Sequence, residues 1–196
     1  MTIATNADLK TALAAASMRS DLDLFMQDFV NRAHAVLARN AIMYAPVTIS
    51  AAGITLPTDF GQVHQLWIMR APAVLLTQVS ADQLALLTDP DVPQWFNIVA
   101  SQVGPAPDQT YEGRLLYKID PTFPAADGDT NSILQAYPFA YVYGALAEIA
   151  RWIFDEDLED RRETAFQAEI GNINQAESAK ALAGAALQMT ASSTVA

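Results

Sequence analysis

Apolar residues recur at helical spacing near both ends of the chain. Residues 6–17 and residues 20–40 each show this period, which predicts two successive helices. Ser20 is placed to cap the second helix, because a serine hydroxyl there accepts a hydrogen bond from an unpaired backbone N–H of the first turn. A third apolar stripe fills residues 138–153. Its members are Phe139, Val142, Leu146, Ile149 and Ile153.

The third helix is predicted to begin near Pro138, because the N–H that proline lacks would be unpaired in a first helical turn anyway. Gly144 lets another backbone approach closely, and we expect Leu146 and Ile149 to lie in the core between helices. The acidic run at residues 155–157 ends this helix and suits the positive N-terminus of the next one. The large apolar side chains of that last helix are Leu158, Phe166, Ile170 and Ile173.

Between the helical parts, residues 44–118 are rich in Val, Ile, Thr, Tyr and Pro, with short apolar runs broken by turn residues. Such runs predict strands. The candidates are residues 47–49, 63–69, 73–76, 95–99 and 115–119. Residues 80–87 are predicted to form a short helix capped by Ser80, and residues 120–130 a loop rich in proline and acidic residues.

The order of helices, then strands, then helices favours an α+β fold over alternating strands and helices. We predict a mainly α-helical bundle with an inserted antiparallel β-region. The N-terminal helices would occupy residues 1–43, the β-rich insertion residues 44–120, and the C-terminal helices of the same bundle residues 130–180. Residues 181–196 would form an extended or docking tail.

Composition narrows the class of protein. At 196 residues, with 52% hydrophobic and 17% charged residues, the chain can bury a core and is not disordered throughout. The formal net charge of −11 argues against tight nucleic-acid binding, because such a surface repels phosphates. It leaves open a role beside DNA, since a passage through which DNA slides should not hold it.

The absence of cysteine excludes disulfides and thiolate metal sites. No apolar run approaches the roughly 20 residues needed to span a bilayer, so we predict no membrane association. Residues 13–16 are apolar, as in a signal peptide, but Asp8 precedes them and no basic segment does. We interpret this segment as an amphipathic helix and expect the protein to be made and used in a cytoplasm.

The feature most suggestive of an enzyme is the acidic cluster at residues 155–163. Its carboxylates could hold Mg²⁺ or Mn²⁺ for phosphoryl hydrolysis, so a metal-dependent hydrolase is one alternative. The interpretation that we favour is a helix start whose acidic residues complement the helix dipole. No nucleophile, base and metal pattern is evident, so we predict no enzymatic activity, no catalytic residue, no metal and no cofactor.

Aromatic and charged residues of the third predicted helix are candidates for a subunit interface. Tyr141 and Trp152 belong to residue types that are enriched at interfaces. Each by itself favours a core position, whereas the aromatic residues as a cluster favour an interface. Glu148 lies in a strongly apolar helix and needs a partner. That partner is either Arg151 or Arg161 of the same chain, or a charged group of a neighbouring subunit.

The C-terminal segment carries a narrow apolar edge. Leu182, Ala186 and Met189 fall at i, i+4 and i+7 of a helix that is predicted to continue to about Met189, because alanine favours helix. An edge this thin cannot bury itself well on a monomer. Together with Leu187 it is therefore a candidate for docking on another chain, and the alternative is a loose tail without a partner.

Short motifs follow one another along the chain. In the C-terminal half they are Asn131, Ile133, Leu134, Tyr137, Pro138, Tyr141, residues 143–148 and residues 155–157. Upstream they are residues 20–22, 28–30, 56–60 and 105–107, Tyr111, and residues 116–117. From about Leu9 to Asn174, their order and spacing together resemble the head–tail adaptor (connector) proteins of tailed bacteriophages.

This resemblance implies a structural protein of the virion neck, between head and tail, that assembles in the host cytoplasm. It implies a ring of identical subunits, a dodecamer, that lies below the portal protein, extends the DNA channel and docks the next neck or tail protein. DNA would pass through the lumen without specific binding. The C-terminal segment with Leu182 and Met189 would reach the portal. A non-structural assembly chaperone is a further alternative.

Overall fold

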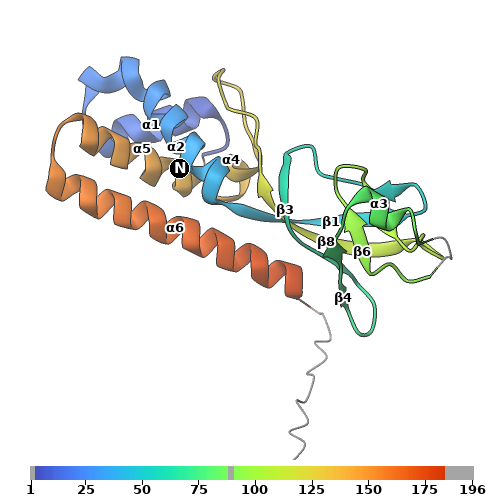
Figure 1. The fold of residues 1–196 in the computed structure, drawn as a ribbon. Helices are drawn as coiled ribbons and strands as arrows, with labels where there is room; N and C mark the ends of the chain where they lie inside the picture. The colour runs from blue at the N-terminus through green and yellow to red at the C-terminus, as the bar shows by residue number, and fades with distance from the viewer. Residues whose placement is uncertain (1–2, 88–90, 184–196) are drawn as a thin grey trace, which may run out of the picture. The chain divides into compact units, whose positions relative to one another are not determined.

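The computed structural model describes residues 3–87 and 91–183, and the chain forms two compact units (Figure 1). The helical unit falls within residues 1–43, 59–61 and 118–176, and the β unit within residues 44–58, 62–117 and 177–196. Strands β1, β3 and β8 and helix α6 each contain residues of both units. The predicted α+β class is confirmed.

The helices of the helical unit follow the predicted periods closely. They are α1 (Asn6–Ser17), the 3₁₀ helix η1 (Ser20–Phe25), α2 (Met26–Asn40), α4 (Ser132–Ala136), α5 (Pro138–Trp152) and α6 (Glu156–Leu182). Proline stands at the first position of α5, as predicted. Helix α4 was not anticipated, because its five residues are too few to show a helical period.

The prediction that Ser20 caps one continuous second helix was wrong. Arg19 holds the extended N-cap conformation, and η1 begins without a side-chain cap. The Arg19 guanidinium instead binds the Asp21 carboxylate, with Nε and Nη2 at 2.8 and 2.6 Å from its oxygens. The tight 3₁₀ turn buries Leu22 and leaves Leu24 92% exposed before α2 begins.

The centre of the helical unit is the crossing of α2, α5 and α6 at Gly144. A Cβ atom added there would lie 2.8 Å from the Cβ of Ala33 in α2 and 2.8 Å from the Cζ of Phe166 in α6. A side chain at this position would force Ala33 or Phe166 to shift, which fits the close approach predicted at Gly144. Leu146 and Ile149 are buried, with 6% and 4% of their surface exposed, which confirms their predicted place in the core.

A polar network lies inside this core. The Tyr141 hydroxyl accepts a hydrogen bond from Asn131 Nδ2 at 2.8 Å and lies 2.8 Å from His34 Nδ1. Burial raises the pKa of Tyr141 to about 12, so the phenol keeps its proton. With one bond accepted from Asn131, the hydroxyl can donate to His34 Nδ1 when the imidazole is neutral with its proton on Nε2.

The β unit is built on a five-stranded sheet in the order β2-β1-β8-β3-β4. Its strands are β1 (Ile42–Ser50), β2 (Gly53–Ile54), β3 (Phe60–Ile68), β4 (Val74–Leu75) and β8 (Tyr111–Ile119). A smaller sheet, in the order β5-β6-β7, contains β5 (Thr77–Gln78), β6 (Trp95–Asn97) and β7 (Gln102–Gly104). Burial alternates along much of β1, as expected of a sheet with one covered face.

The predicted strands were confirmed, and some further short strands were missed. All five predicted runs overlap observed strands, and Ser80 caps α3 (Ala81–Leu84) in a capping box. Strands β2, β5 and β7 span only two or three residues, too few for a period of two to show. The β6–β7 pair is antiparallel as predicted, whereas β5 pairs with β6 in parallel.

We expect Leu146→Ala to lower the free energy of unfolding by about 2–5 kcal/mol, because it leaves a cavity at a buried site. Phe139→Ala, on the same helix but at a position that is 55% exposed, is the matched control and should cost less than about 1 kcal/mol. Chemical denaturation of the two variants measures both values. Equal losses would contradict the assignment of Leu146 to the core.

The stability of the protein should fall as His34 takes up a proton. Burial lowers the pKa of His34 from 6.5, against the opposing charge of Asp120. The unfolded chain therefore binds the proton first, and this loss begins near pH 6.5 and grows as the pH falls towards the folded-state pKa. His34→Gln keeps a hydrogen-bond acceptor and does not titrate. The wild type should lose stability relative to this variant between pH 7.5 and 5, and parallel pH curves would refute the prediction.

Candidate interface pocket at the C-terminal end of helix α5

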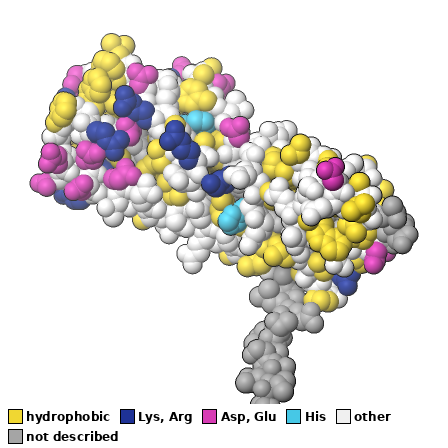
Figure 2. Space-filling view, in the orientation of Figure 1, with side chains coloured by type: hydrophobic (Ala, Val, Ile, Leu, Met, Phe, Trp, Pro, Cys, Tyr) yellow, Lys and Arg dark blue, Asp and Glu magenta, His cyan; other side chains and the backbone are white. Residues whose placement is uncertain are grey.

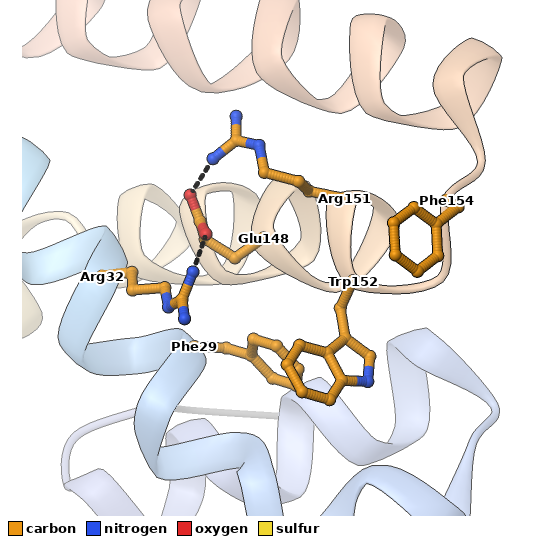
Figure 3. A pocket seen from close by; sticks show the side chains of 6 residues that line it. All are labelled: Phe29, Arg32, Glu148, Arg151, Trp152 and Phe154. Carbon is orange, nitrogen blue, oxygen red and sulfur yellow. Dashed lines mark hydrogen bonds and ion pairs between the residues drawn. The ribbon is translucent and has the colours of Figure 1, made fainter.

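A pocket of about 230 Å³ opens on the surface of the helical unit (Figure 3). It is lined by Phe29, Arg32, Glu148, Arg151, Trp152 and Phe154. Its volume lies below the roughly 300–1,000 Å³ of typical small-molecule sites, so it suits side chains of another protein better than a cofactor. Glu148 and Trp152, two of the predicted interface candidates, are brought together here.

Helical spacing explains why these residues meet. Glu148, Arg151 and Trp152 stand at i, i+3 and i+4 of α5, and Phe29 and Arg32 stand at i and i+3 of α2, so each set shares one helix face. The packing of α2 on α5 then turns the two faces towards each other (Figure 3). The pocket is thus a consequence of the same helix crossing that buries the core.

Glu148 is held by two arginines of its own chain. Its Oε1 lies 2.5 Å from Arg151 Nη1, and its Oε2 lies 3.6 Å from Arg32 Nη1. Only 9% of Glu148 is exposed, and a carboxylate so buried requires such partners. Of the two intrachain partners that the sequence suggested, Arg151 pairs with Glu148, whereas Arg161 Nε donates to the backbone oxygen of Asp157.

Arg151 also reaches two acidic residues of α6. Its Nε lies 2.7 Å from Glu159 Oε1, and its Nη2 lies 3.9 Å from Glu163 Oε2. The hydrogen bond to Glu159, together with the negative charges of Glu148 and Glu163, raises the pKa of Arg151. The guanidinium therefore stays positively charged. Arg32 contrasts with Arg151, because its guanidinium is 59% exposed and meets Glu148 at the longer distance.

Trp152 forms the apolar wall of the pocket. Its ring centroid lies 5.4 Å from that of Phe25 and 6.1 Å from that of Phe29, in tilted and edge-on arrangements. These contacts cover one side of the indole, yet the residue is still 48% exposed. A large aromatic side chain that packs against its own chain on one side and is exposed to solvent on the other is typical of interface anchors.

Phe154 stands at the rim in an unusual conformation. Its φ of 57° is left-handed, and the backbone N–H groups of Phe154 and Asp155 donate to the carbonyls of Arg151 and Ala150. This pattern is the Schellman motif that ends many helices, and glycine usually occupies the left-handed position. Here a phenylalanine occupies it with 91% of its surface exposed.

The acidic cluster acts as a helix start. Asp155 Oδ1 accepts a hydrogen bond from the backbone N–H of Leu158, and Glu159 and Glu163 face Arg151. Across residues 3–87 and 91–183, no set of three or more histidine, aspartate or glutamate residues lies close enough to hold a metal ion. The hydrogen bond that Asp155 accepts and the ion pairs of Arg151 with Glu159 and Glu163 fit the interpretation of this cluster as a helix start.

The remaining predicted site residues lie elsewhere. Tyr141 is fully buried in the core network, so it offers no surface to a neighbouring subunit in this fold. Leu182 ends α6 and is 41% exposed, whereas Ala186, Leu187 and Met189 lie outside the described residues. Among the described helices, none is long and apolar enough to cross a membrane.

Arg32 and Phe154 are pocket residues that were absent from the predicted candidates. A helical projection of α2 would have placed Arg32 beside Phe29 on one face, so a signal for it existed. For Phe154 the signal was weaker. It is the apolar residue that directly precedes the acidic run, at the point where a glycine would be expected after a helix.

We expect Phe154→Gly to raise the free energy of unfolding by up to about 1 kcal/mol. Glycine removes the left-handed penalty of roughly 1–2 kcal/mol, which outweighs its greater entropy in the unfolded chain. Phe154→Ala keeps the penalty and serves as the control. Thermal unfolding that places the glycine variant below the alanine variant would contradict this explanation of the helix end.

Comparison with known proteins agrees with the resemblance that the motifs indicated. A family model described as SU10 adaptor protein matches residues 1–189, which is nearly the whole chain. No curated protein sequence matches the chain. Since the family model covers both the helical elements and the β-rich insertion, the chain belongs to the SU10 adaptor protein family, a family of phage head–tail adaptors.

Proposed function

We propose that this protein is a structural ring-forming adaptor of the virion neck. Copies of the chain form a ring, with twelve subunits by the resemblance described above, below the portal of a phage head. The observation that carries the proposal is the family match over residues 1–189. The exposed pocket at Trp152 supports it, because a supported but uncovered aromatic surface is what a subunit interface requires.

A ring of identical subunits needs head-to-tail contacts, in which two different surfaces of each copy meet and the rotation closes. Glu148 and Trp152 are the proposed interface residues of one such surface. Glu148 holds Arg32 at the pocket mouth, and Trp152 supplies the apolar area. Tyr141 is buried and bonded to Asn131, and we propose that it holds α5 in place from inside the helical unit.

The end of α6 is anchored within the β unit, which gives the C-terminal segment a fixed starting point. Arg114 Nη1 donates to the carbonyl of Ala181 at 3.0 Å and also to that of Ala183. Glu177, only 1% exposed, accepts from the backbone N–H of Tyr44 at 2.9 Å. We propose that the segment beyond this anchor docks on the portal through Leu182, Ala186, Leu187 and Met189.

The surface charge is compatible with a channel for DNA. The chain has a formal net charge of −11, and acidic and basic side chains are mixed over the visible face of the helical unit (Figure 2). A wall of this kind binds phosphates weakly, so DNA would pass through the lumen without specific binding. The ring would also provide the docking face for the next neck or tail protein.

The adaptor role predicts a specific assembly defect. A phage without this gene should accumulate heads that carry portal but no tail, and a plasmid-borne copy of the full chain should restore tailed particles. A copy ending after Ala183 keeps the carbonyls that bind Arg114, so it should fold yet fail to restore tails. Electron microscopy and infectivity measure both outcomes.

Two results would contradict this proposal. Tailed particles at the normal rate with the truncated copy would refute portal docking by the C-terminal segment. Absence of the chain from finished particles would refute the structural role and favour an assembly chaperone. Truncation before Ala181 is unsuitable for this test, because Ala181 is fully buried and its loss would disturb the fold.

A further inference from the structure

We infer that the pocket at Trp152 receives the aromatic pair Phe139–Tyr143 of a second copy of this chain. This inference rests on the proposed ring and names the two surfaces that meet in it. Phe139 and Tyr143 form an aromatic ridge at the N-terminal end of α5, with ring centroids 6.4 Å apart. The pocket lies at the C-terminal end of the same helix.

Exposure distinguishes the two ends of α5 from its middle. Every residue from Gly144 to Ala150 is buried, whereas Phe139 is 55% and Trp152 is 48% exposed. The side chains in the middle of the helix are therefore already covered by other residues of the same chain. Both ends still present aromatic surface to solvent, and such side chains dominate the energetics of protein interfaces.

The two aromatic surfaces point in opposite directions. Tyr143 and Trp152 are nine positions apart, which at about 100° per residue places them roughly 180° apart around the helix. Along the axis they are about 14 Å apart at about 1.5 Å per residue. A contact between these surfaces is head-to-tail, so each copy has one surface for each neighbour, as a closed ring requires.

Polar groups on the two surfaces complement each other. None of the described residues hydrogen-bonds the Tyr143 hydroxyl, which is therefore available as an acceptor. Arg32 is largely exposed and uses one ion pair at 3.6 Å, although its guanidinium has five N–H donors. Arg32 can donate to the incoming phenol and stack on an aromatic ring, which a positively charged guanidinium favours. Arg151 is already committed to three carboxylates.

The test uses two single variants of the full-length chain and their mixture. Phe139→Ala removes the ridge and leaves the pocket, and Trp152→Ala removes the indole wall and leaves the ridge. Sedimentation should show self-association weakened about thirtyfold for each variant, the loss typical of an interface hot spot. An equimolar mixture should form pairs and nothing larger. The Phe139→Ala copy supplies the intact pocket and the Trp152→Ala copy the intact ridge, so only one contact can form between them.

Leu86→Ala is the matched control, since Leu86 is 80% exposed in the β unit and should leave association unchanged. Melting curves confirm that all variants fold. Tyr143→Phe and Arg32→Ala should each weaken association, and the double variant should be no weaker than the poorer single one. That non-additivity reports the direct contact, which a purely structural role of either residue would not produce.

Four outcomes would overturn the inference. They are a wild-type chain that stays monomeric, variants that associate like the wild type, a mixture that restores large assemblies, and a single variant that forms dimers by itself. None of these refutes the adaptor role, which depends on the presence of the chain in the necks of tailed particles. A chain missing from those particles would overturn both.

Discussion

The crossing of α2, α5 and α6 at Gly144 is the constraint on which the helical unit depends. A side chain at this position would meet Ala33 and Phe166 at 2.8 Å, so a larger residue would fit only if one of them moved. Because the three helices meet there, the faces of α2 and α5 that carry Arg32 and Glu148 are brought into register. The apolar contact of Gly144 with Ala33 and Phe166 therefore positions the surface pocket, although none of these three residues lines it.

The same crossing explains where the aromatic residues of α5 end up. Residues near the middle of the helix are covered on all sides, so Tyr141 must satisfy its hydroxyl internally with Asn131 and His34. Residues at the ends have fewer neighbours, and Phe139 and Trp152 keep about half of their surface exposed. One helix thus serves both as the core of the unit and as the carrier of two exposed surfaces.

Helical periods and turn chemistry were enough to predict most of the fold. The stripe that contains Leu146 and Ile149, Pro138 at the start of α5, and the Ser80 cap of α3 all rest on local rules. What local rules could not supply is the choice between alternatives that depend on tertiary packing. Whether an aromatic residue of α5 lies inside or outside depends on which of its neighbours crosses it, and the spacing along α5 does not encode that.

The candidate site shows the same division. Glu148 was expected to need a charged partner, and of the candidates left open (Arg151, Arg161 or a group of a neighbouring subunit) the structure pairs it with Arg151. The second partner, Arg32, lies more than a hundred positions away in the sequence and becomes a neighbour only through the packing of α2 on α5. Short elements such as β2 and β5 failed for a related reason, since they exist only because a longer strand pairs with them.

Two helix ends depart from local preference in the same way. Met18 after α1 and Phe154 after α5 both adopt left-handed conformations that favour glycine, and both are 91% exposed. The left-handed conformation costs each residue roughly 1–2 kcal/mol, and neither side chain is buried by its own chain. Backbone strain combined with full exposure of an apolar side chain is expected where the compensating contact comes from another molecule. For Phe154, which borders the pocket at Trp152, a contact with a neighbouring subunit in the proposed ring would supply that compensation.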